Sequence, residues 1–266
     1  MKKDFLRPVD VKLERAKVQI DEIFLLVEKS VADNRIKFSC NEFENKLGYY
    51  LYVGDYTEDN FFEELSVRVG EFIHNLRSIL DNLVYALARV HNDPPKNPRK
   101  LSFPICENRE IFDRSTIDIL EQIPLPARET ILSAQPFMFG NLPGFKSESY
   151  VLSIITYLNN ADKHRIPASF IAVFDELYIN GKIYFDEDDY VEINETQKFK
   201  IQLPVTPKLK FFEFHTEDFI YQIDLEFKLS YNIAIEVFDE ILHIDYLKNL
   251  LRSTEILVRH FRNNFE

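Results

Sequence analysis

The longest apolar pattern in the chain lies at residues 60–91, which read "NFFEELSVRVGEFIHNLRSILDNLVYALARVH". Apolar side chains recur every three or four residues along this segment, so they fall on one face of an α-helix. Pro94 and Pro95 follow, and proline ends a helix because it has no amide hydrogen to donate. The pattern therefore predicts one long amphipathic helix that needs other helices to cover its apolar face.

Weaker helical patterns flank this segment on both sides. They predict helices at 10–32, 108–122, 127–135, 147–164 and 243–263. Between the first of these and the long helix, alternating apolar and polar residues predict a β-hairpin with strands at about 35–42 and 46–54.

The hydrophobic period changes from helical to alternating between residues 168 and 240. This stretch is rich in Ile, Val, Phe and Tyr, which predicts an antiparallel sheet of four to six strands. Asn180-Gly181 is a dipeptide typical of a two-residue hairpin turn, so we expect a turn there.

The order of helices, strands and a final helix predicts the α+β class. We expect a helical domain over 1–166 that carries the hairpin at about 35–54. An antiparallel β region over 167–240 is appended to it, and the C-terminal helix in 241–266 packs back on the helical domain.

The net charge and the lengths of the apolar runs indicate which ligands and which location to expect. The 266 residues carry a net charge of -12, and the segment from Ala168 to Glu240 accounts for -10 of it, with sixteen Asp or Glu against six Lys. An acidic chain is a poor non-specific ligand for a phosphate backbone, although the helical part, near neutrality, leaves a local RNA site open. No run of eighteen apolar residues and no apolar segment behind "MKKDFLRPVD" is present, so we expect no membrane span and a cytoplasmic location.

Metal and cofactor sites are not expected. Cys40 and Cys106 are far apart and form no metal-type cluster. Neither a Gly-rich phosphate loop nor a nucleophile elbow is present. The acidic run "DEDDY" at 186–190 is interpreted as a solvated loop between strands, because such runs are rarely metal sites.

The long helix carries a polar stripe opposite its apolar face. Gly70, His74, Arg77 and Asp81 lie together on this stripe at about 100° per residue. One interpretation is a solvated face with an Arg77–Asp81 ion pair. The alternative is a face that another segment covers, because it then continues with Tyr85 instead of Lys or Glu.

A second polar stretch ends the helix predicted at 147–164, in the sequence "LNNADKHRIP" at 158–167. Continuing the apolar stripe by helical rotation brings Asp162 and Arg165 onto the buried face, whereas Lys163 and His164 point elsewhere. The stretch can also be a plain helix C-terminus, where cations favour the helix dipole.

Buried charges need partners, since an unpaired one costs several kcal/mol. The long helix offers complementary groups, so we expect Asp162 to pair with Arg77 and Arg165 with Asp81. The two polar stretches would then face each other, and His74 and His164 would lie near the rim of the contact.

The segments "GEFIHNLRSILDNLVYALA" and "LNNADKHR" together resemble a set of uncharacterised bacterial proteins with H-x-L-R-x-x-L-D-[HN]-L and a later D-K-H-R. The first segment is also similar to the motif of the HEPN superfamily, the higher eukaryotes and prokaryotes nucleotide-binding helical domains. That resemblance implies a helical bundle, a homodimer and a metal-independent ribonuclease of the toxin–antitoxin or phage-defence type. Arg77 matches the motif's arginine, but Asn82 stands where the motif has its histidine.

Two functional hypotheses follow. In the first, the chain is an endoribonuclease in which His74 or His164 takes the proton from a 2′-hydroxyl. Arg77, Lys163 and Arg165 would then stabilise the phosphorane, and Asp81 and Asp162 would orient these cations. In the second, the charged residues are a structural clasp in a non-catalytic module that binds RNA, a nucleotide or a protein partner.

Overall fold

The computed structural model describes residues 4–32, 38–54, 61–138, 151–163, 170–203, 208, 210–238 and 240–265. The chain divides into two compact units. One, the helical unit, comprises residues 1–24, 65–168 and 245–266, and the other, the β unit, comprises 25–64 and 169–244. The order of elements confirms the predicted α+β class.

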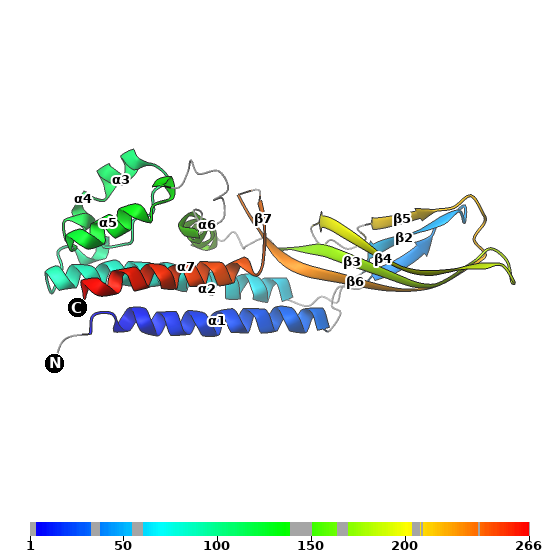
Figure 1. The fold of residues 1–266 in the computed structure, drawn as a ribbon, viewed down its shortest axis with the longest axis horizontal. Helices are drawn as coiled ribbons and strands as arrows, with labels where there is room; N and C mark the ends of the chain where they lie inside the picture. The colour runs from blue at the N-terminus through cyan, green and yellow to red at the C-terminus, as the bar shows by residue number, and fades with distance from the viewer. Residues whose placement is uncertain are drawn as a thin grey trace. The chain divides into compact units, whose positions relative to one another are not determined.

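Figure 1 shows the helices and strands in chain order. The α-helices are α1 (Arg7–Ala32), α2 (Phe61–His91), α3 (Arg109–Ser115), α4 (Ile117–Leu120), α5 (Leu125–Ser133), α6 (Val151–Lys163) and α7 (Tyr246–Phe261). Short 3-10 turns are η1 (Pro98–Lys100), η2 (Pro136–Met138) and η3 (Arg262–Asn264). No helix among these described residues is apolar over a length sufficient to cross a bilayer.

The helix boundaries agree with the hydrophobic patterns to within a few residues, except at 108–122, and residues 147–150 and 164 of the helix predicted at 147–164 lie outside the described residues. At 108–122 the structure has two helices, because the chain bends at Thr116. The hydroxyls of Ser115 and Thr116 donate to the carbonyls of Ile111 and Phe112, at 2.7 Å in each case. Such bonds to the carbonyl four residues back compete with the helical ladder and bend or end a helix.

The core of the helical unit forms along α2. Its apolar stripe is fully buried from Leu65 through Leu76 to Leu87. A polar link crosses this core between α1 and α2, where Asn75 donates to the carbonyl of Lys12 and to the side chain of Gln19, both at 3.0 Å. Phe261 of α7 packs edge to face against Phe103.

The β unit consists of two antiparallel sheets. Its strands are β1 (Phe38–Glu42), β2 (Gly48–Val53), β3 (Phe170–Tyr184), β4 (Tyr190–Leu203), β5 (Lys210–His215), β6 (Gln222–Val237) and β7 (Glu240–His243). They pair in the orders β1-β2-β5 and β4-β3-β6-β7. Side chains from both sheets share one core, in which Tyr49 of β2 contacts Phe227 of β6 and packs near Ile183 of β3. The unit is therefore a β-sandwich.

The predicted hairpin joins this sandwich. We expected β1 and β2 within the helical domain, but β2 pairs with β5 along Gly48–Tyr52. The region 168–240 correspondingly does not form one sheet, because β5 leaves it to pair with the hairpin. A solvent-facing hairpin of two strands is only marginally stable, whereas a third strand and a facing sheet bury its apolar side.

The prediction of a turn at Asn180-Gly181 is wrong. Both residues lie inside β3, and the chain reverses at 185–189, where the predicted acidic loop is found. Gly181 has φ +139°, and a Cβ atom built there would lie 2.1 Å from the backbone oxygen of Asp224 on β6. The glycine is thus required by the close approach of a neighbouring strand.

Candidate functional site

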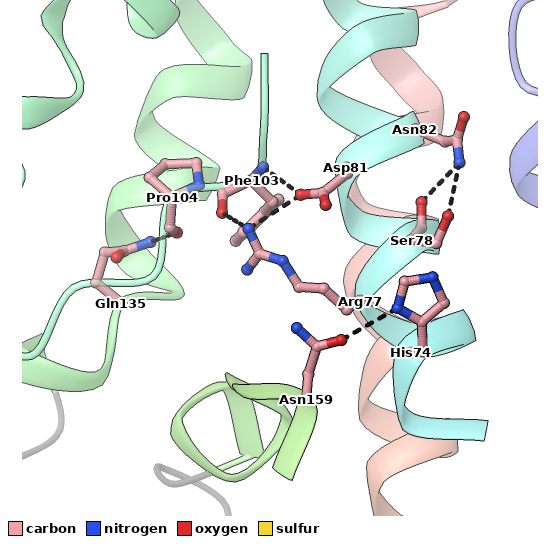
Figure 2. Close-up of polar contacts among 9 residues, drawn as sticks. All are labelled: His74, Arg77, Ser78, Asp81, Asn82, Phe103, Pro104, Gln135 and Asn159. Atoms are coloured by element: carbon pink, nitrogen blue, oxygen red, sulfur yellow. Dashed lines mark hydrogen bonds and ion pairs between the residues drawn. The ribbon is translucent and has the colours of Figure 1, made fainter. Parts of the chain in front are cut away.

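Arg77 and Asp81, on the polar stripe of α2, bind the backbone of Phe103. Arg77 Nη2 donates to the carbonyl oxygen of Phe103 at 2.7 Å, and the amide of Phe103 donates to Asp81 Oδ1 at 2.8 Å. The two side chains also form an ion pair with each other at 3.0 Å. Figure 2 shows the three groups meeting at one point. Another segment therefore covers the polar stripe at Arg77 and Asp81, as one of the two interpretations of the sequence proposed.

The same covering segment is held from its other side by Gln135. The Gln135 side chain is fully buried, donates to the carbonyl of Pro104 at 2.9 Å and accepts from the amide of Cys106 at 3.0 Å. Every buried backbone polar group needs such a partner, because an unpaired one costs about 1–3 kcal/mol. Residues 103–106 are thus held between α2 and the end of α5 by side chains that bind their backbone amides and carbonyls, as a neighbouring strand would.

His74 lies on the same stripe, one turn before Arg77, and is exposed. Its Nδ1 atom is 3.3 Å from Oδ1 of Asn159 on α6, which brings α2 and α6 into contact as expected. An amide oxygen can only accept, so in the neutral tautomer that makes this hydrogen bond the proton is on Nδ1. Nε2 is then left as an acceptor.

The remaining predicted site residues are the four consecutive residues 162–165. Asp162 and Lys163 belong to the last turn of α6, but their side chains lie outside the described part, as do His164 and Arg165 entirely. The expected pairs Asp162–Arg77 and Arg165–Asp81 therefore stay predictions. The stripe that led to them is real, since Val151, Ile154, Ile155 and Leu158 are all buried.

A pocket of about 360 Å³ lies beside the bound segment. Its floor and walls come from α2, from residues 102–106, from the bend between α3 and α4, and from α6. Apolar walls are supplied by Phe103, Pro104 and Ile119. Polar groups are supplied by the residues Arg77, Ser102, Ser115, Thr116, Thr156, Asn159 and Asn160. The volume falls within the range of small-molecule sites, and the lining is more polar than is usual for them.

The described residues of the pocket include neither an activated thiol nor a set of metal ligands. Burial raises the pKa of the Cys106 thiol, which lines the pocket, so the thiol is less reactive than a free cysteine. No group of three or more His, Cys, Asp or Glu in the described part of the chain is placed to hold a metal ion.

Several site residues were not identified in the sequence. The partner of Arg77 and Asp81 is a peptide group, and a peptide group is present at every position, so Phe103 has no distinguishing signal. Gln135 likewise stands at the end of the helix predicted at 127–135, where no pattern marks it as a binding residue. Asn159 belongs to the stretch "LNNADKHR", but an uncharged amide there carries no signal that predicts its contact with His74.

Comparison with known proteins places no constraint on this site. The chain matches no protein-family model, and no significantly similar curated protein or solved structure is found. The inference of function therefore rests on the geometry of the helical unit.

Proposed function

We propose that the chain is a non-catalytic module that binds a nucleotide or RNA through its helical unit. The observation that carries this proposal is the use of Arg77 and Asp81. Both side chains bind the Phe103 backbone, so they act as an internal clasp that builds one wall of the pocket. The ion pair with Asp81 also offsets part of the positive charge that a catalytic arginine would direct at a developing charge on the substrate.

The charge of the two units supports a phosphate-bearing ligand for the helical unit. The β unit holds 25 Asp and Glu against 10 Lys and Arg, a net charge of -15. The helical unit holds 22 Lys and Arg against 19 Asp and Glu, a net charge of +3. A polyanion is repelled by the first unit and tolerated by the second.

Fluorescence anisotropy with labelled single-stranded and structured RNAs tests this proposal. We expect binding at about 50 mM salt that weakens as salt rises, since counterions are released. Alanine substitution of the three exposed cations Lys96, Arg99 and Lys100 should weaken it. A matched triple on the β unit, at Lys198, Lys208 and Lys228, should leave it unchanged. Equal losses from both triples, or no binding of RNA or mononucleotide at low salt, would contradict the proposal.

The second candidate is the metal-independent endoribonuclease that the resemblance to the HEPN superfamily implies. It is favoured by the contact between His74 and Asn159, which leaves Nε2 of an exposed imidazole as an acceptor next to Arg77. Such an atom is suited to take the proton of a 2′-hydroxyl. Lys163, His164 and Arg165 would complete this site.

An RNA panel incubated with EDTA separates the two candidates. A ribonuclease should cut without metal, leave a 2′,3′-cyclic phosphate, and lose activity in His74→Ala. His91→Ala, which removes an exposed histidine from the end of the same helix, is the matched control. Cleavage that survives His74→Ala would eliminate this base, and RNA that is bound but never cut would leave the binding module alone.

A further inference from the structure

The pocket beside Phe103 holds polar groups that the fold does not use. Arg77 makes both of its contacts through Nη2, and within the described residues Nε and Nη1 have no hydrogen-bond partner. Asn159 is only 3% exposed, and its Oδ1 is engaged by His74, while no described group accepts from its amide nitrogen. Figure 2 shows the guanidinium of Arg77 and the Asn159 amide on the same side of α2, next to Phe103 and Pro104.

Thr156, one turn before Asn159 on α6, adds a third unused group. Its hydroxyl oxygen is buried and has no hydrogen-bond partner in the described structure. A buried hydroxyl left unpaired is destabilising, and native proteins keep few of them. Thr156 also lines the pocket, so a bound ligand would supply the missing partner.

We propose that this pocket binds the phosphate of a phosphate monoester, with Arg77, Asn159 and Thr156 as its donors. This inference rests on the proposed function and names the ligand group for it. A phosphate monoester carries a charge of about -1.5 to -2 and presents three acceptor oxygens, which matches three donors from different side chains. Arg77 is the one charged residue among the described residues of the lining, and it supplies a planar set of N–H groups.

The same charges limit the size of the anionic group. Asp81 already offsets part of the charge of Arg77 at 3.0 Å. A di- or triphosphate would bring more negative charge than the described lining can neutralise. The apolar walls formed by Phe103, Pro104 and Ile119 can instead pack against an uncharged part of the ligand, such as a base.

Isothermal titration of the full chain tests this with AMP, adenosine, inorganic phosphate and acetate. We expect AMP to bind at least tenfold more tightly than adenosine, and inorganic phosphate to bind where acetate does not. Thr156→Val, which keeps the shape of the side chain, should weaken AMP about tenfold. The matched control is Thr254→Val, whose hydroxyl is also buried but donates to the Leu250 carbonyl far along α7 and does not line the pocket.

Thermal unfolding of the free protein provides the second measurement. Thr156→Val should leave stability equal or higher without ligand, because it removes an unpaired hydroxyl. A stability loss as large as the loss of binding would mean that Thr156 serves the fold alone, and would overturn the proposal. AMP and adenosine binding equally, acetate binding as well as phosphate, or none of the probes binding would each also overturn it.

Failure of the proposed function has a different signature. If inorganic phosphate binds in a Thr156-dependent way while no nucleotide and no RNA binds, the pocket inference holds and the nucleotide or RNA function fails. If AMP and adenosine bind equally, with no effect of Thr156→Val, nucleotide binding holds and the phosphate assignment fails.

Discussion

Replacing Asp81 by alanine tests the clasp most directly. Asp81 accepts from the Phe103 amide and from Arg77, both within 3.0 Å. Hydrogen bonds to a charged group each contribute about 1.5–3 kcal/mol, and the exposure of Asp81, at 36% of its side chain, reduces this. The substitution also strands the Phe103 amide in a residue that is fully buried. We therefore expect Asp81→Ala to lower the free energy of unfolding by about 2–3 kcal/mol.

The chain offers a matched control on α3. Arg109 and Asp113 form another ion pair four residues apart, at 2.8 Å, with more than half of each side chain exposed. That pair binds no backbone group of another segment in the described residues, so Asp113→Ala should cost only about 0.3–0.5 kcal/mol. The difference between the two substitutions measures what the contact with Phe103 adds.

Urea unfolding followed by far-UV circular dichroism is the appropriate assay. The chain has no tryptophan, and the helical unit dominates this signal, so unfolding of the helices is seen even if the β unit unfolds separately. Asp81→Asn keeps an acceptor for Phe103 and should lose about 1 kcal/mol. Equal effects of Asp81→Ala and Asp113→Ala would refute the clasp and leave a solvated ion pair.

Two further predictions concern the β unit. Gly181→Ala should destabilise the sandwich by about 2–3 kcal/mol or prevent its folding, because the new Cβ would overlap the Asp224 carbonyl; an unchanged melting temperature would contradict the close approach. Burial raises the pKa of Cys40 from 9.0 to about 11 and that of Tyr49 from 10.0 to about 12. Because each pKa is higher in the folded protein than in the unfolded chain, the two groups stabilise the folded protein below pH 9. This stabilisation is lost as the pH rises from 9 to 12. Cys40→Ala should flatten the first part of that loss, and a pH–stability curve identical to wild type would contradict it.

Local patterns in the sequence determined the type and extent of most elements. The stripe on α2 is visible because burial of one helical face requires apolar residues every three or four positions, and each of those positions from Leu65 to Leu87 is buried. The alternation after residue 168 predicts strands for the same reason, with a period of two. The polar stripe with Arg77 and Asp81 was also visible, together with the possibility that another segment covers it.

Tertiary structure alone decided what these elements contact. Asn180-Gly181 has the composition of a turn, but the glycine is required because the backbone of β6, more than forty residues away in the sequence, leaves no room for a Cβ atom. The pairing of β2 with β5 joins segments whose patterns fit many partners equally well, and only the shared sandwich core selects one. Arg77 and Asp81 bind a peptide group, which every residue possesses. A side chain's chemistry can be read from the sequence, whereas a backbone partner is chosen by the packing that brings it within reach.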